Sequence, residues 1–399
     1  MKSTNAKQHG FTKNDSVCLK GIAIILLMCI HSFGNTARFK GYEFDFGFLG
    51  QDLYVDLAYY CKISVSIFAF ISGYGLYLSL KNQKNGLRDT NKWVGLRLIK
   101  TMNGFWLWYV ISFVIMQVGY NLPAEKYFGK GLIRGSVYML LDFLGLAGLF
   151  GTPTLNAAWW YMSAAIAFIA LMPALVRITQ KTENNAGGGW LTLFATVIIL
   201  PRLLFNSEFF GAMNPFSFIL PVCFGALFAE FDLFTKINNF RIAKNKIINE
   251  LTLLIIGTVI IIASILVWIR VPMSRLWEYH FGVAPVLLII FCNRFILGGT
   301  DFLRKGINKV LFVLGKYSMS MYIFHSFIRT YILKDFLYSM KYPILTIVSL
   351  LLISLAIAVV FSYFQKLICY NKLTAFIEKK FLSLFDCKSA LSSNNSESA

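Results

Sequence analysis

The first residues able to do chemistry are a lysine and a histidine within one long apolar stretch. Lys20 and His31 stand eleven positions apart, about three helical turns, so both side chains fall on one helix face about 16 Å apart along the axis. Ionisable groups inside membrane segments are costly and are functional candidates for that reason. A neutral imidazole can accept a proton from a hydroxyl group. The structural alternative makes Lys20 a surface anchor and His31 a hydrogen-bonding residue between helices.

A second polar cluster lies near the other end of the chain. Ser318, Tyr322 and His325 follow one another at i, i+4 and i+7, which places them on one stripe of a helix. Counted from the cytoplasmic ends of their segments, His31 and His325 lie about 21 Å and about 22 Å along the helix axis. Two histidines from distant parts of the chain are therefore predicted at the same depth. Hydrogen bonding between helices alone also produces such a stripe.

Two basic residues near the third apolar segment are candidates for binding a phosphorylated ligand. Arg97 and Lys100 are three positions apart and face the same way on a helix. With Lys20 they form a group of cations that suits the phosphates of a cytosolic ligand. Ordinary cytoplasmic loop charge explains the same residues without a ligand.

Three other side chains are candidates for contact with a polar substrate. Ser72 interrupts the second apolar segment, where small polar residues also serve close helix packing. Trp160 opens the fourth segment, where an aromatic belt at the membrane surface explains it equally well. Glu278 lies in the loop 270–280, where it either contacts a substrate or is simply solvated.

The composition indicates that a membrane bundle positions these side chains. The chain has 399 residues, of which 57% are hydrophobic and 14% charged, and its mean hydropathy is +0.62. Soluble chains carry about a quarter charged residues, and a helix needs about 20 apolar residues to cross a bilayer. We therefore predict an all-α, polytopic membrane helix bundle. Its ten predicted spans are 17–35, 57–80, 101–118, 157–176, 190–205, 214–230, 248–269, 281–297, 309–331 and 343–365.

One further apolar stretch, 136–150, is too short for a span and contains Asp142. We expect it to be re-entrant or interfacial. The predicted domains are a cytoplasmic N-terminal segment (1–13), a ten-span membrane domain (14–368) and a partly disordered cytoplasmic tail (369–399).

The net charge of +19 follows from the predicted topology. With the N-terminus inside, the inner segments hold 25 of the 38 Lys and Arg residues, and the outer segments hold 11. The positive-inside rule therefore places both termini in the cytoplasm. The basic residues are spread over short loops and form no single basic face, so we expect no nucleic-acid partner.

Several other classes of protein are excluded by missing patterns. The seven cysteines are odd in number, scattered and without a CxxC pair, which excludes a disulfide-stapled module. The sequence has no P-loop, no HExxH and no cysteine–histidine metal set. It also lacks a GxSxG elbow. We expect no metal cofactor.

Five short motifs, in this order, resemble those of the membrane acyltransferase-3 family. The resemblance runs from about residue 14 to 368. The matching segments are Lys20 with His31, Ser72-Gly73-Tyr74 after Phe68-Ala-Phe70, Trp159–Ser163, Phe218–Gly225 and Gly315–His325. The sequence departs from the family pattern by having Lys20 where arginine is usual. It also has Lys100-Thr-Met-Asn103 where a proline-containing stretch often opens the third span.

The resemblance implies an O-acyltransferase. In such enzymes an acyl group, usually acetyl, passes from a cytosolic coenzyme A thioester to a hydroxyl of a cell-surface carbohydrate. For this chain the partners implied are acetyl-CoA, a carbohydrate acceptor and membrane lipid, and the location implied is the bacterial plasma membrane. The oligomeric state is left open.

The residues suggest roles in such a reaction. We expect His31 to act as a general base or, alternatively, to be acylated first. Tyr322 and Ser72 are candidate donors to the oxyanion, and His325 orients either the acceptor or His31. The candidates for the phosphates of the donor are Arg97, Lys100 and Lys20.

The competing interpretation is a transporter or flippase for a lipid-linked saccharide. It would share the span number and the intramembrane histidines. Against it, the two halves of the chain show no internal hydropathy repeat.

Overall fold

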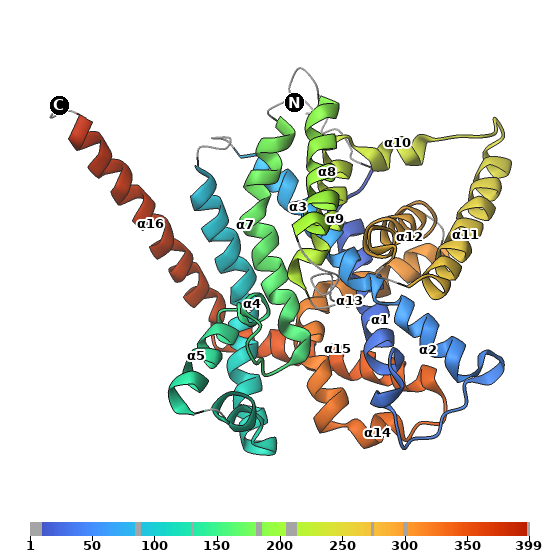
Figure 1. The fold of residues 1–399 in the computed structure, drawn as a ribbon, viewed down its shortest axis with the longest axis horizontal. Helices are drawn as coiled ribbons and strands as arrows, with labels where there is room; N and C mark the ends of the chain where they lie inside the picture. Colours follow the sequence, from blue (N-terminus) through green and yellow to red (C-terminus); the bar gives the residue numbers. More distant parts are fainter. Residues whose placement is uncertain are drawn as a thin grey trace.

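The computed structural model describes residues 10–83, 89–129, 131–180, 186–204, 214–272, 275–297 and 302–396. Within these ranges the chain is built from helices and contains no β-strand (Figure 1). The predicted all-α fold is therefore confirmed. The helices are α1 (Lys13–Phe33), α2 (Gly50–Tyr60), α3 (Ile63–Lys81), α4 (Thr90–Tyr120), α5 (Leu132–Phe143), α6 (Ala147–Phe150), α7 (Trp160–Gln180), α8 (Ala186–Leu204), α9 (Ile219–Glu230), α10 (Leu233–Asn239), α11 (Lys246–Arg270), α12 (Ala284–Cys292), α13 (Phe302–Phe327), α14 (Lys334–Tyr338), α15 (Pro343–Leu367) and α16 (Tyr370–Ser396).

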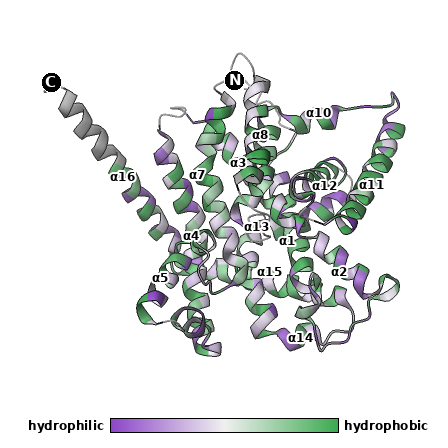
Figure 2. Ribbon diagram, viewed as in Figure 1, coloured by the Kyte–Doolittle hydropathy of each residue, from purple (hydrophilic) through white to green (hydrophobic). Residues whose placement is uncertain are grey.

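Seven helical segments of the described chain are long and apolar enough to cross a membrane. They are Lys13–Phe33, Gly47–Lys81, Thr90–Tyr120, Ala157–Thr179, Lys246–Arg270, Tyr279–Leu297 and Pro343–Leu367. On α11, Ile247 is 78% exposed and Val259 is 59% exposed. An apolar helix this exposed requires lipid around it. Figure 2 shows hydrophobic residues along most helices and hydrophilic ones in connections such as that between α10 and α11.

The predicted number of ten spans stays a prediction. Helix segments Pro215–Glu230 and Leu233–Asn239 are bent by 69° at a short break, and counting them as one broken span gives eight. The other two predicted spans are helical but fall short of the same test. The apolar part of α8, Gly188–Leu200, is short, and α13 carries lysines at 305, 309 and 316.

The short apolar stretch 136–150 and the C-terminal tail are both largely helical. The stretch 136–150 falls within α5 and α6, which a turn at Gly145 separates, and neither helix is long enough to span. Helix α16 runs from Tyr370 to Ser396, and the partly disordered cytoplasmic tail stays a prediction. Its first part is anchored on α4, where the Phe381 ring fills the space beside Gly95.

A close glycine contact sets the register of α1 against α13. A Cβ atom added at Gly21 would lie 2.2 Å from the Leu311 carbonyl oxygen, and one added at Gly315 would lie 1.8 Å from the Val17 carbonyl oxygen. Only glycine permits backbones this close. The two glycines face each other, and a histidine follows each by ten residues, about 15 Å along the axis. The contact therefore brings both histidines to one level.

The segments assigned to opposite membrane sides lie at opposite ends of the bundle. Helix α10, from the predicted cytoplasmic segment 230–247, lies at the top of Figure 1. Helices α5 and α14, from the predicted outer segments 119–156 and 329–342, lie at the bottom. This separation agrees with the predicted topology, and the location of the termini stays a prediction.

Candidate active site

Two histidine rings meet where α1 and α13 lie side by side. His31 Nδ1 is 2.5 Å from His325 Nε2, and the ring centroids are 4.7 Å apart. The other nitrogen of His325, Nδ1, lies 2.8 Å from the Tyr322 carbonyl oxygen and 3.2 Å from that of Met321. A carbonyl oxygen can only accept a hydrogen bond. We therefore assign the hydrogen of the His325 ring to Nδ1.

This assignment fixes the hydrogen positions of the whole pair. A neutral imidazole carries one N–H, so Nε2 of His325 is an acceptor and Nδ1 of His31 donates to it. The Ser326 hydroxyl lies 3.2 Å from the same Nε2 and is a second donor to it. Nε2 of His31 is then left with a lone pair and no hydrogen. That is the state required of a general base or a nucleophile.

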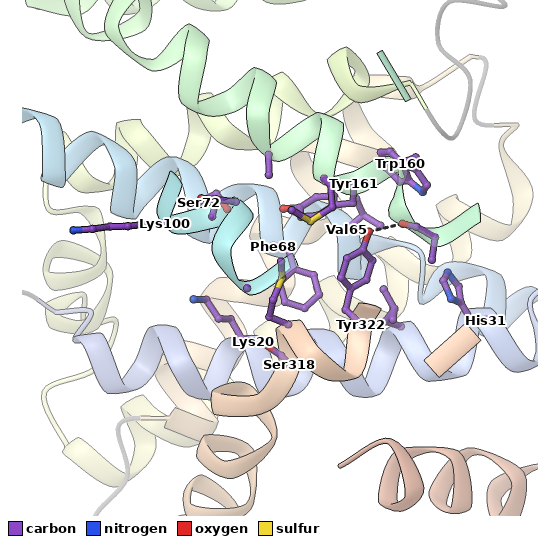
Figure 3. Close-up of a pocket in the computed structure, with 17 residues that line it drawn as sticks. Lys20, His31, Val65, Phe68, Ser72, Lys100, Trp160, Tyr161, Ser318 and Tyr322 are labelled. Carbon is purple, nitrogen blue, oxygen red and sulfur yellow. Dashed lines mark hydrogen bonds between the residues drawn. The ribbon is translucent and has the colours of Figure 1, made fainter. Parts of the chain in front are cut away.

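The His31 side chain borders a cavity of about 370 Å³ inside the bundle. Helices α1, α3, α4, α7 and α13 contribute to its wall, together with the turn before α7. Figure 3 shows Lys100, Lys20 and Ser72 toward one end, and His31 and Trp160 toward the other. The cavity therefore follows α1 from its lysine to its histidine.

The middle of the cavity is apolar and its ends are polar. Side chains of Leu27, Val65 and Phe68 line it between the lysine and histidine ends. At the lysine end, Lys100 Nζ lies 3.7 Å from a carboxylate oxygen of Glu378 on α16. Such a cavity suits an elongated ligand that is anionic at one end and reacts at the other.

A set of hydrogen bonds joins the turn before α7 to α13, the helix that carries His325. The Ile323 carbonyl oxygen accepts from the Asn156 side chain at 3.1 Å and from the Trp159 indole at 2.9 Å. In return, the Tyr322 hydroxyl donates to the Ala158 carbonyl oxygen. These bonds fix α13 just before His325, and so help to hold the histidine pair.

A buried carboxylate holds the segment that leads into these hydrogen bonds. Asp142 is 1% exposed and accepts from the Tyr127 hydroxyl at 2.5 Å. It also accepts from the Thr154 hydroxyl and the Leu155 backbone N–H, both at 2.8 Å. Asp142 thus fixes the segment that leads into Asn156, which makes it a positioning residue.

The structure brings most of the predicted site residues together. Six of them line the cavity, and they are Lys20, His31, Ser72, Lys100, Trp160 and Tyr322. His325 lies against His31, so of its two predicted roles the contacts favour orienting His31 over orienting the acceptor. Arg97 and Glu278 are not among the lining residues.

The geometry changes what some of these residues can do. Arg97 donates to the Ser79 hydroxyl and packs over the Trp93 ring at 5.8 Å, so it joins α3 to α4 and is not among the residues that line the cavity. The Tyr322 hydroxyl is engaged by a backbone carbonyl, which gives it a positioning role in place of the expected role as oxyanion donor. Lys20 lies about 16 Å from His31 along α1, too far to touch the same reacting atoms.

Ser72 and Glu278 also differ from their expected positions. Ser72 lies toward the lysine end of the cavity in Figure 3, away from His31, which does not favour a bond to an oxyanion formed there. Glu278 directly precedes the short turn Tyr279–Val283, outside the cavity wall. Its contact with a substrate stays a prediction.

Sequence reasoning missed several residues that shape the site. Tyr161 lines the cavity beside Trp160, and its place in a Trp-Trp-Tyr run was the available signal. Asp142 was visible only as a charge in an apolar stretch. The contribution of Asn156 had no sequence signal, because it depends on a carbonyl group that lies 167 residues further along the chain.

The comparison with protein families agrees with this geometry. Residues 17–363 match the acyltransferase domain that defines the acyltransferase-3 family, and the chain belongs to that family. No curated protein and no solved structure matches the chain. The protein is therefore a multi-pass membrane acyltransferase, with an acyl donor and an acceptor as its substrates.

Proposed function

We propose that this protein is an O-acetyltransferase that moves acetyl from cytosolic acetyl-CoA to a hydroxyl of a cell-surface or lipid-linked polysaccharide. The observation that carries the proposal is the cavity that joins two lysines to the base nitrogen of His31. The bacterial plasma membrane is the expected location.

The lysine end suits the coenzyme. Lys20 and Lys100 supply two cations for its phosphates, and ammonium groups are common phosphate ligands. The apolar middle, with Leu27 and Phe68, accommodates the thin arm that carries the thioester. At Gly104, a Cβ atom would meet nothing within 4 Å, so the lysine end is open beside that residue. The thioester carbonyl then reaches the level of His31.

At the histidine end of the cavity, the reaction requires His31 to take up one proton and later to release it. Nε2 of His31 takes the proton of the acceptor hydroxyl as that oxygen forms a bond to the thioester carbonyl carbon. When the tetrahedral intermediate collapses, the carbon–sulfur bond breaks. The proton then passes from His31 to the departing thiolate, so the products are the acetyl ester and free coenzyme A.

His325 and Trp160 assist this step in different ways. His325 accepts the Nδ1 hydrogen of His31, which holds the ring in place, leaves its Nε2 without a hydrogen and stabilises the imidazolium that forms. Trp160 is half-buried in the cavity wall, where its ring can pack against the face of a sugar. A route through acetyl-His31 uses the same lone pair, so the two routes share this geometry.

The proposal is tested with labelled acetyl-CoA. Membranes with and without the protein are incubated with the label, and the glycans are then isolated and analysed. We expect protein-dependent label in an ester linkage to a saccharide hydroxyl. Movement of lipid-linked saccharide without any acyl-CoA dependence would favour the transporter interpretation and overturn the proposal.

A further inference from the structure

Three basic side chains interact electrostatically with the histidine pair from outside the lining of the cavity. They are Arg38 in the turn after α1, Lys62 between α2 and α3, and Arg329 in the turn after α13. We call these three residues the outer cation cluster, because the predicted topology places all three near the outer face. They come from separate parts of the chain, and sequence patterns gave no reason to group them.

The contacts of the two arginines place them beside the histidines. Arg38 donates to the carbonyl oxygen of Ile30, the residue before His31. Arg329 follows His325 by four positions, in the π-helical turn Ile328–Ile332 that continues α13. Its Nη1 is 3.3 Å from the Tyr338 hydroxyl, which in turn donates to the Ser32 carbonyl oxygen at 3.1 Å.

Electrostatic interactions link the members of the cluster to the same two rings. Both arginines interact electrostatically with His31 and with His325. Lys62 interacts electrostatically with His31, and Arg38 interacts in the same way with Lys62. Burial, and then the neighbouring Arg329, lower the pKa of Arg38 to about 10, so its guanidinium is still cationic at neutral pH.

The cluster has no compensating charge of its own. In the described part of the chain, no carboxylate forms an ion pair with Arg38, Lys62 or Arg329. Each is only partly exposed, and Nε of Arg329 is buried without a hydrogen-bond partner. Partly buried cations without a carboxylate partner are unfavourable, and their mutual repulsion adds to the cost.

Two cations elsewhere in the described residues do have carboxylate partners. Lys81 lies 2.5 Å from a Glu230 carboxylate oxygen, and Arg294 lies 2.9 Å from one of Glu250. Lys81, Glu230 and Arg294 lie in segments predicted to be at the cytoplasmic side, and Glu250 lies in the predicted span 248–269. Lys20 and Arg97 are also partly buried and have no ion-pair partner among the described residues, so what distinguishes the outer cation cluster is that three such cations lie around one histidine pair.

We propose that the outer cation cluster binds an anionic group, a carboxylate or a phosphate, on the saccharide acceptor and so brings the neighbouring hydroxyl to His31. The identification of this anionic ligand as the saccharide acceptor rests on the proposed function. Guanidinium groups form charge-assisted, often bidentate hydrogen bonds with both kinds of anion. The positive electrostatic potential of the three cations also attracts an anionic substrate, and added salt weakens this attraction.

The test measures equilibrium binding to the full-length protein in phosphatidylcholine nanodiscs. The probes are fluorescent tetragalacturonate and its uncharged methyl ester, with fluorescent galactose 1-phosphate and galactose as the phosphate pair. We expect at least tenfold tighter binding of the charged member of one pair. The pair that shows the preference identifies carboxylate or phosphate as the anion.

Matched variants separate binding from folding. Arg38→Gln and Arg329→Gln should each reduce the charged-over-neutral preference about tenfold, while Arg329→Lys should retain part of it. Lys334→Gln removes an exposed cation that packs over Tyr42, and should change nothing. Equal binding of charged and neutral probes would overturn the proposal. So would variants that weaken both members of a pair equally.

Membranes that carry the same parent and variant proteins are assayed in parallel for transfer of labelled acetyl to the endogenous glycan. Transfer without any preference for anionic probes would overturn the anion site and leave the proposed function standing. An anion preference in a protein that transfers no acetyl would overturn the proposed function and support the site.

Discussion

The closeness of α1 and α13 leads to a graded prediction about glycine substitutions. In Gly315→Ala the new Cβ atom would lie 1.8 Å from the Val17 carbonyl oxygen, where ordinary contacts begin at 3.4 Å. The helices must then move apart by the difference, about 1.6 Å. If the shift is carried along α13 to His325, the 2.5 Å contact with His31 opens to about 4.1 Å, beyond hydrogen-bond range.

A misplacement of this size has a predictable effect on rate. A shift of about 1 Å in reacting groups commonly costs about 100-fold, so Gly315→Ala should retain about 1% of the acetyl-transfer rate. Gly21→Ala, whose Cβ would lie 2.2 Å from the Leu311 carbonyl oxygen, needs a smaller shift and should lose less. Gly306→Ala lies on the same helix with nothing within 4 Å and should match the parent protein.

The assay compares initial rates of labelled acetyl transfer for the three variants at equal amounts of folded protein. Size-exclusion profiles and thermal unfolding control for misfolding, because overpacking also costs about 1–3 kcal/mol of stability. The reasoning would be refuted if Gly315→Ala were folded and as active as Gly306→Ala. It would also be refuted if Gly306→Ala lost as much activity as Gly315→Ala.

Three further predictions concern the supports of the cavity. Asp142→Ala leaves two buried donors, the Tyr127 hydroxyl and the Leu155 N–H, without their acceptor, so it should lower the free energy of unfolding by about 3 kcal/mol, and an unchanged thermal midpoint would contradict this. Lys100→Gln should raise the KM for acetyl-CoA about tenfold with little change in kcat, whereas Glu378→Gln, which releases that lysine, should not raise it. Gly104→Trp should block the cavity beside Lys100 and stop turnover of acetyl-CoA, while Gly104→Ala should be tolerated, and equal rates for the two would place the donor elsewhere.

The sequence predicted the level of the histidine pair but not the contact. Residue counts from the segment ends placed His31 and His325 at one depth, because helical rise is nearly constant. Their adjacency depends on Gly21 meeting Gly315, a contact between helices far apart in the chain. Only the structure shows that contact, and only the carbonyl oxygens beside His325 fix which nitrogen of His31 is free.

Side-chain direction limited the prediction of the other site residues. Arg97 and Lys100 share one helix face by spacing, yet only Lys100 borders the cavity, because Ser79 and Trp93 hold the arginine at the α3–α4 contact. The outer cation cluster joins residues from three segments, and no local pattern links them. The predicted span number depended on hydropathy, which is weakest where α13 carries its lysines.

The most direct test of the central claim replaces His31 itself. Labelled acetyl-CoA is supplied to membranes that carry the parent protein, His31→Ala or His280→Gln at equal protein levels. His280 is a buried histidine whose ring nitrogens lie near backbone carbonyls outside the cavity, so it controls for loss of an imidazole. We expect acetyl transfer to fall by about 10²–10⁴-fold in His31→Ala and to persist in His280→Gln. Undiminished transfer in His31→Ala would contradict the claim that this histidine carries the reaction.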